Sequence, residues 1–348
     1  MQAFLSQSLN RKNIIRGFIF FVLCTLIGLY VSFLWGGTKN LGSALSSIRG
    51  KFLIIALLCM LSDWACGAAR FYIFVRKMTP QVTFFDSIRA TLATLCVGGI
   101  TPFQTGGVGY IYIFNRSGVP LSGCMTLGII SFIGTLMFLI CSAGYAVWKS
   151  PSFLPKGFAI FGQYSLVMFA LVLLFLFVMV IKPGVLLFPL TKIRLMNRRG
   201  FPFPTKVLNR LALSVEKLIG EHKAFTHMFI AHHKGVFALS LLLSGGIYMS
   251  RFVGGYVVVQ VLGGNAPFWD VIAAQAILHF TTLFAPSPGA SGIAEFFTVV
   301  LMEDLIKPDV VALYALMTRF FTTYFAVAIG GTVLVPQLAK DLKQGKVE

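Results

Sequence analysis

Six ionisable side chains lie inside apolar stretches of this chain, and they are the residues that could do chemistry. A charged group in a membrane-spanning segment costs on the order of 2.5–3.5 kcal/mol, so each is expected to face a polar interior and to have a partner. A guanidinium group matches phosphate oxygens well, which makes such arginines candidates for holding an anionic headgroup. The six residues are Asp63, Arg70, Arg251, His279, Glu295 and Arg319.

Two interpretations of the three arginines remain open. In the first, Arg70, Arg251 and Arg319 bind the headgroup of a substrate. In the second, they pair with Asp63, Glu295 and backbone carbonyl groups and only hold the helices together. Because Asp63 and Arg70 are two helical turns apart, they could face one cavity without touching each other.

Glu295 also has two interpretations. It lies near the expected start of a helix, where the helix dipole stabilises an acid, or it binds a proton or cation that couples transport. A membrane-embedded lipid phosphatase or transferase would need a nucleophile with a positioned base. His279 is the only histidine in an apolar segment, and no serine or carboxylate set accompanies it, so no catalytic residue is assigned.

Two segments rich in proline and glycine, 100–109 and 284–293, interrupt the apolar stretches in the two halves of the chain. Such interruptions at corresponding positions indicate a transporter's binding site, because non-helical backbone at membrane depth is tolerated only inside protein or beside a polar cavity. Glycines there leave N–H groups free to meet an anion. The substrate-binding candidates are Pro102, Gln104, Thr105, Gly106, Gly107, Pro286, Ser287, Pro288, Gly289, Ser291 and Gly292.

The two segments fit a sequence repeat. An offset of 184 positions places Asp86 on Asp270 and Pro102 on Pro286 without a gap. Each segment is predicted to be the tip of a re-entrant helical hairpin, which enters and leaves the membrane on one side. The hairpins are expected over 83–114 and 267–302, within a first repeat of about 51–148 and a second of about 235–335.

The elements that position these residues must be membrane helices. Of the 348 residues, 57% are hydrophobic and only 11% are charged, and the mean hydropathy is +0.84, which excludes one soluble core. The predicted fold is an all-α polytopic membrane protein, a single transmembrane domain over 1–348 with six full transmembrane helices and two re-entrant hairpins forming an inverted repeat. Each span needs roughly 20 apolar residues, and the six runs are 14–35, 51–75, 120–148, 164–181, 235–262 and 308–335.

The distribution of charge predicts the orientation. The net charge of +18 is concentrated in the loop 183–234 and its borders, and the positive-inside rule makes that loop cytoplasmic. Counting spans from it places nineteen basic residues on the cytoplasmic side and six on the other, with both termini cytoplasmic. The first hairpin then enters from the cytoplasm and the second from outside, so the repeats are inverted.

The parts outside the spans are expected to be interfacial. A helix is predicted over 205–233, lying along the anionic cytoplasmic leaflet, with a second short helix over 41–48 on the outer side. The six cysteines have no C-x-x-C spacing and predict neither a zinc site nor a disulfide framework. The four histidines of the basic segment lack a metal-binding spacing and are expected to be solvated: His222, His227, His232 and His233.

The order of elements and two motifs resemble a known family. Segments 101–107, 111–120 and 285–295 are similar to those of the lysylphosphatidylglycerol synthase transmembrane, or flippase-like, family of bacterial and archaeal inner-membrane proteins. In its best-known members this region is fused to an aminoacyl-transfer domain. No such domain is expected in this sequence, so the resemblance implies a stand-alone lipid translocase. Many members carry an acid after the first glycines, where this chain has Tyr110. The family positions are Pro102, Gly106, Gly107, Pro286, Pro288, Gly289, Gly292 and Glu295.

The predicted function is a flippase-like lipid translocase that moves an anionic phospholipid or lipid-linked headgroup across the cytoplasmic membrane. Membrane lipids, expected to be anionic, are the partners; no cofactor, metal or nucleic acid is expected, and a homo-oligomer is left open. The alternatives are a secondary transporter of a small solute or ion, favoured by the inverted repeat with Asp63 and Glu295, and an accessory membrane subunit. Fold likeness alone does not determine the substrate.

Overall fold

The chain is a multi-pass membrane protein whose described elements are all helices. The computed structural model describes residues 11–35, 48–149, 154, 156–182, 184, 205–283 and 285–343, so most of the short helix expected over 41–48 lies outside the described residues. Helix α2 (Arg11–Trp35) contains a shorter apolar stretch, Arg16–Val31, among its described side chains. Among the described residues, five helical stretches are long and apolar enough to cross a membrane: α4 (Gly50–Met78), α7 (Leu121–Lys149), Gly162–Ile181 within α8 (Lys156–Ile181), α11 (Lys234–Val261) and Pro308–Asp341.

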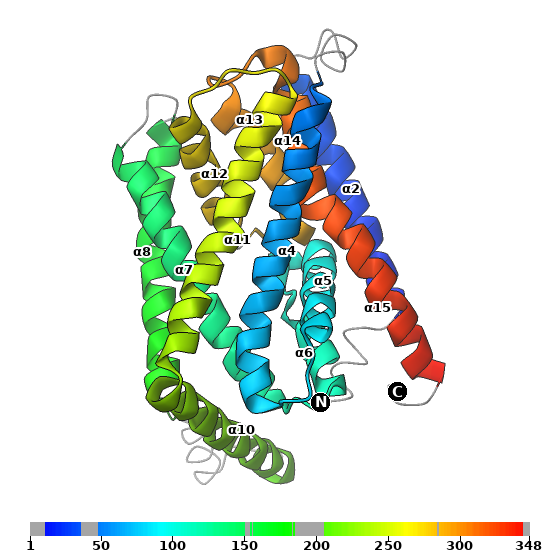
Figure 1. The fold of residues 1–348 in the computed structure, drawn as a ribbon, viewed down its shortest axis with the longest axis vertical. Helices are drawn as coiled ribbons and strands as arrows, with labels where there is room; N and C mark the ends of the chain where they lie inside the picture. Colours follow the sequence, from blue (N-terminus) through cyan, green and yellow to red (C-terminus); the bar gives the residue numbers. More distant parts are fainter. Residues whose placement is uncertain are drawn as a thin grey trace.

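Helices α4 and α11 form an antiparallel pair in the middle of the protein (Figure 1). The N–H of Arg49, just before α4, donates to the carbonyl oxygen of Val261 at the end of α11, at 2.8 Å. Small residues let the two helices approach, since a Cβ at Gly246 would lie 2.9 Å from the Cys66 sulfur. This pair supplies three of the six ionisable candidates, Asp63, Arg70 and Arg251, from adjoining surfaces.

Two broken helix pairs occupy opposite halves of the molecule. In Figure 1, α5 and α6 lie in the lower half and α12 and α13 lie in the upper half. Their non-helical tips meet: the N–H of Phe103 donates to the carbonyl of Ala285 at 3.1 Å, and the N–H of Gly289 donates to the carbonyl of Thr101 at 3.4 Å. The bounds are α5 (Phe84–Ile100), η1 (Pro102–Gln104), α6 (Gly107–Arg116), α12 (Phe268–Thr282), η3 (Pro288–Ala290) and α13 (Ile293–Met302).

The first helix of each pair begins with an acid in its first turn, Asp86 in α5 and Asp270 in α12. The Asp86 N–H donates to the Thr83 hydroxyl at 3.2 Å, and the Asp86 carboxylate accepts from the Thr83 N–H at 3.0 Å. This capping box satisfies two donors that the first turn of α5 would otherwise leave unpaired. Asp270 lies in the first turn of α12, so both acids favour a helix start at the same offset.

The tips have the same backbone conformation, but not at the predicted offset. Phe103 in η1 and Gly289 in η3 both have φ 55° and ψ 22°, and each follows a proline. Pro102 is therefore equivalent to Pro288, and its gap-free alignment with Pro286 is wrong. Helix α12 is two residues shorter than α5, and Pro286 stands in the added extended segment because proline cannot continue a helix.

The C-terminal run is a helix with one widened turn. Helix α14 (Pro308–Arg319) continues through the π-turn η4 (Phe320–Tyr324) into α15 (Phe325–Lys343). Such a turn inside an α-helix is frequent at functional sites because it changes which side chains share a face. Here it lies directly after Arg319, at the level of the tips, and α2 packs across the same region with Gly28 against Gly292.

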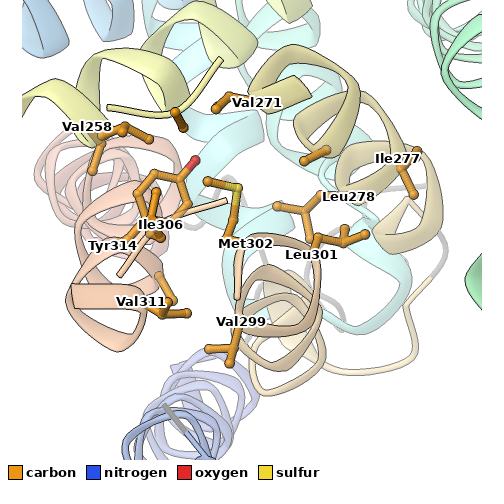
Figure 2. Close-up of a cluster of buried hydrophobic side chains, with 14 of the residues drawn as sticks. Val258, Val271, Ile277, Leu278, Val299, Leu301, Met302, Ile306, Val311 and Tyr314 are labelled. Atoms are coloured by element: carbon orange, nitrogen blue, oxygen red, sulfur yellow. The ribbon is translucent and has the colours of Figure 1, made fainter. Parts of the chain in front are cut away.

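A buried apolar cluster fastens the second hairpin to the rest of the protein. Figure 2 shows Val258 of α11, Val271 of α12, Val299 of α13 and Tyr314 of α14 converging on one core. Tyr314 is fully buried, and its hydroxyl accepts a hydrogen bond from Gln275 Nε2 at 2.8 Å. The cluster therefore orients α12 and places Gln275 beside the central cavity described below.

Close packing of α15 on α5 depends on Gly330. A Cβ there would lie 2.3 Å from the Leu92 carbonyl oxygen and 2.7 Å from the Cys96 Cβ, whereas at Gly331 it would meet nothing within 4 Å. Gly330→Ala is expected to destabilise the protein by about 1–3 kcal/mol through overpacking. The matched Gly331→Ala is expected to be neutral or to stabilise by up to about 1 kcal/mol. Thermal unfolding in detergent measures both, and equal shifts would contradict this packing.

Helix α10 (Thr205–His232) confirms the helix predicted in the basic segment, but the expectation for its histidines is wrong at one position. His227 and His232 are exposed, whereas His222 is buried, with Nδ1 2.7 Å from the Thr126 hydroxyl of α7. Burial lowers the pKa of His222 below its ordinary value of 6.5. The neutral imidazole therefore anchors α10 to the membrane helices.

This anchor predicts a pH-dependent detachment of α10. The docked state of α10 favours neutral His222, because burial lowers the pKa of this histidine. The contribution of His222 to docking is therefore complete above pH 6.5, the ordinary pKa, and decreases as the pH falls below that value. Amide protection factors of α10, corrected for intrinsic exchange, are expected to fall by up to about tenfold per pH unit there. His222→Gln should abolish this slope and the exposed His227→Gln should keep it; a slope unchanged in His222→Gln would refute the anchor.

Candidate functional site

Two of the three membrane arginines are neutralised by carboxylates, and the first pair joins the central helices. Arg251 of α11 donates to Asp63 of α4 through Nε, at 3.0 Å, and through Nη2, at 3.3 Å. The guanidinium carbon also lies 5.2 Å from the centre of the Tyr248 ring. Both carboxylate oxygens accept from one guanidinium, so Asp63 is committed to Arg251 and neutralises its charge.

The second pair holds the tip of the second hairpin. Arg319 donates from Nε to Glu295 at 2.9 Å, from Nη1 to the Thr323 hydroxyl at 2.8 Å and from Nη2 to the Gly289 carbonyl at 2.7 Å. A longer bond of 3.3 Å reaches the Ser291 hydroxyl. The guanidinium is thereby committed to protein groups, which favours the structural interpretation of Arg319.

Glu295 is equally committed. It is fully buried, and its carboxylate accepts from the Tyr324 hydroxyl at 2.7 Å and from the Gly292 N–H at 2.6 Å, in addition to Arg319. Gly292 has φ 85°, a left-handed conformation that favours glycine, and this turn aims its N–H at the acid. The carboxylate therefore closes the start of α13 and ties it to α14 and the π-turn η4.

Arg70 is different, because its described partners are all uncharged. Nη1 donates to the Thr135 hydroxyl and the Ser244 hydroxyl, both at 3.1 Å, and to the Ser131 carbonyl at 3.4 Å. Its Nε is buried and has no hydrogen-bond partner in the described part of the chain. No acidic side chain among the described residues forms an ion pair with it, so Arg70 carries a positive charge that the site does not balance.

A central cavity of about 210 Å³ lies where the tips meet. The paired Arg251 and Arg319 line it, together with His279, whose Nε2 is buried and has no partner in the described residues. Its wall is otherwise made of small and hydroxyl-bearing residues from both hairpins and the C-terminal helices. These are Thr94, Gly98, Gly99, Gly106, Gly107, Gln275, Thr282, Gly289, Ala294, Thr298, Thr318, Thr322 and Thr323, with Leu95 and Leu278.

A larger cavity, of about 460 Å³, contains Arg70. Thr94 and Gly107 line both cavities, so the two adjoin at the first hairpin. Met125 of α7 also lines the larger cavity and is 45% exposed, so this cavity reaches the surface of the protein. The remaining wall is mainly apolar: Phe71, Tyr110, Ile111, Gly128, Ile129, Ser131, Phe132, Thr135 and Leu176.

The predicted tip residues separate into two groups. Gly106, Gly107 and Gly289 line the central cavity, and Ser291 and Gly292 bind the ion pair beside it. The exposed residues Pro102, Thr105 and Pro286 do not line either cavity, nor do the buried Pro288 and the partly buried Ser287. The side chain of Gln104 lies outside the described part of the chain.

Sequence reasoning missed the threonines. Thr94, Thr282, Thr298, Thr318 and Thr322 line the central cavity and come from five different helices or turns. A signal was present in the run 317–324, where three threonines surround Arg319 inside an apolar helix. Threonine is common in transmembrane helices, so only the π-turn and the meeting of the tips identify these as one lining.

The sequence comparisons show the family of this chain. The family described as "Lysylphosphatidylglycerol synthase TM region" matches residues 14–330, which is most of the chain. A UPF0104 membrane protein of Archaeoglobus fulgidus is 22% identical over 317 residues, which cover 86% of this chain and 92% of that protein. With the match running from within α2 to within α15, this chain belongs to the lysylphosphatidylglycerol synthase transmembrane family.

Proposed function

We propose that this protein is a flippase-like translocase that moves an anionic phospholipid or lipid-linked headgroup across the cytoplasmic membrane of a bacterium or archaeon. The observation that carries the proposal is Arg70, an unbalanced guanidinium in a cavity that reaches the protein surface. An arginine fork suits the oxygens of a phosphate group. The membership in a family linked to lipid handling supports the same class of substrate.

The proposed topology has six spans, with α2 as the first, and two re-entrant hairpins that enter from opposite sides as an inverted repeat. The antiparallel α4 and α11, the shared φ and ψ of Phe103 and Gly289, and the tips that meet support this arrangement. The excess of basic residues in and around 183–234 supports a cytoplasmic location for both termini. Substrate sites between such repeats lie near the midplane of the membrane.

The larger cavity suits a lipid better than a free anion. Its wall near Arg70 is mainly apolar, with Phe71, Ile111 and Ile129 among the lining residues, and Met125 is exposed at its edge. A headgroup can therefore enter while the acyl chains remain in the bilayer, so that only the polar part needs a path through protein. This division lowers the cost of moving a phosphate across the hydrocarbon core.

A secondary transporter of a small polar solute is the second candidate, and the central cavity is the observation that favours it. That cavity is lined by hydroxyl groups and has room for a small molecule without acyl chains. In that case Arg70 would bind a soluble anion. The third candidate is an accessory membrane subunit. We propose no catalytic activity, no cofactor and no nucleic-acid partner. A homo-oligomer is left open.

The decisive experiment is lipid movement in liposomes that contain the purified protein. Fluorescent phosphatidylglycerol, a polyprenyl phosphate and a neutral lipid are supplied in one leaflet, and their appearance in the other is followed by dithionite quenching. Faster movement of the anionic lipids than in protein-free liposomes is expected. No movement of any lipid, combined with uptake of a soluble organic phosphate, would replace the proposal by the solute transporter.

A further inference from the structure

Four of the threonines that line the central cavity present acceptors to it: Thr94, Thr298, Thr318 and Thr322. Each hydroxyl has one proton, and in Thr94, Thr298 and Thr318 that proton goes to the carbonyl four residues earlier, at 2.6–2.8 Å. Thr322 donates in the same way to the Thr318 carbonyl, at 2.8 Å. A hydroxyl that donates to its own helix keeps its lone pairs, so these side chains offer acceptors to a ligand in the cavity.

His279, which lines the same cavity, has an unsatisfied polar atom in its ring. Its Nε2 has no hydrogen-bond partner in the described part of the chain, and the ring lies 6.1 Å from that of Tyr248 and 5.8 Å from that of Phe252. A buried polar nitrogen without a partner is costly, and a bound group that hydrogen-bonds removes that cost. A ligand hydroxyl suits either tautomer, because it both donates and accepts.

The charges around the cavity disfavour an ionic ligand there. Arg251 and Arg319 line it, but each is neutralised by a carboxylate, so neither offers an uncompensated charge to an anion. An ammonium group would meet the two guanidinium groups without a carboxylate to pair with, since Asp63 and Glu295 are committed to them. The lining therefore suits a ligand that is uncharged and carries hydrogen-bond donors.

We propose that the central cavity receives a neutral, hydroxyl-bearing headgroup, such as a polyol or a sugar, while Arg70 holds the phosphate that links it to the lipid. This inference rests on the proposed lipid translocation and specifies its substrate class. The two cavities adjoin at Thr94 and Gly107, so one phosphodiester headgroup can occupy both. The cavity of about 210 Å³ exceeds the volume of several water molecules, each about 30 Å³, which suits a small polyol.

The test compares three lipids with identical acyl chains in the same liposomes: phosphatidylglycerol, phosphatidic acid and phosphatidylethanolamine. The first has a phosphate and a diol, the second a phosphate alone, and the third an ammonium. The native protein is expected to move phosphatidylglycerol at least about tenfold faster than the other two, because a polar site left unfilled discriminates strongly. Lipid-induced thermal stabilisation of the protein should follow the same order and provides a readout besides transport.

Isosteric variants locate the selectivity. Thr318→Val and Thr322→Val remove one acceptor each. Each is expected to slow the movement of phosphatidylglycerol by about 3- to 10-fold and to leave the rate for phosphatidic acid unchanged. Thr332→Val is the control, because the Thr332 hydroxyl also donates within its helix, at 2.7 Å to Ile329, but does not line the cavity. Thr298→Val repeats the test from the second hairpin if either variant folds poorly.

The outcomes separate the two proposals. Equal movement of phosphatidylglycerol and phosphatidic acid, with equal effects of the threonine variants on both, would overturn the headgroup inference and leave the lipid translocase standing. Fastest movement of phosphatidylethanolamine would overturn it as well, in favour of a cationic headgroup. Movement of no lipid by a folded and oriented protein would overturn both.

Discussion

Arg70→Gln is expected to slow the movement of an anionic lipid by about 10- to 100-fold, the equivalent of one charge-assisted hydrogen bond. The guanidinium of Arg70 has no carboxylate partner among the described residues, so a substrate phosphate is what would complete its coordination. Arg70→Lys keeps the charge but loses the fork, and an intermediate rate is expected from it. The rates are measured by dithionite quenching of a fluorescent lipid in liposomes.

The same substitution is expected not to lower the unfolding temperature, and this separates a binding role from a structural one. Burying an unbalanced charge is unfavourable, so replacing it with a neutral amide removes a desolvation cost. Arg76→Gln is the control on the same helix: Arg76 is exposed and donates to the Tyr72 hydroxyl at 2.8 Å. Equal losses of transport in both variants, or a large fall in stability of Arg70→Gln, would contradict the proposed role.

Glu295→Gln is expected to destabilise the protein by about 3–5 kcal/mol, the typical effect of removing one partner of a buried ion pair. The carboxylate is fully buried and accepts from Arg319, Tyr324 and the Gly292 N–H, so the change leaves the Arg319 guanidinium unbalanced at the hairpin tip. Thermal unfolding in detergent measures the loss. The double variant Glu295→Gln with Arg319→Met removes both charges and is expected to recover part of it.

This result also decides between the two interpretations of Glu295. If the acid is structural, the surviving Glu295→Gln protein should transport with an unchanged dependence on pH. A coupling role for a proton requires that the dependence disappear while the unfolding temperature stays close to that of the native protein. The three hydrogen bonds to the carboxylate favour the structural outcome.

The helices and their interruptions follow from local sequence. Long apolar runs predict helices wherever they occur, and the bounds of α4, α7 and α11 lie within three residues of the predicted ones. The breaks at Pro102 and Pro288 follow from a residue that cannot donate a backbone hydrogen bond or continue a helix. The offset between the two tips does not follow, because the second segment has two prolines, Pro286 and Pro288, and either could have begun the turn.

The burial of His222 shows the limit of pattern reading in the basic segment. Its apolar face and lysines predict an interfacial helix, and α10 confirms the helix. Whether a histidine on it contacts lipid, water or protein depends on what lies opposite. The hydroxyl of Thr126, which is 96 positions earlier in the chain, lies opposite His222.

The sequence by itself determined that this is a helical membrane protein, where its helices break, and which ionisable residues lie among apolar ones. Only the tertiary structure decided which arginine is unbalanced. Arg251 and Asp63 are 188 positions apart, and Arg319 and Glu295 are 24 apart, so their pairing depends on how helices distant in the chain pack. Charge neutralisation depends on distances of about 3 Å, which local sequence does not encode, and this is why Arg70 stands out only after folding.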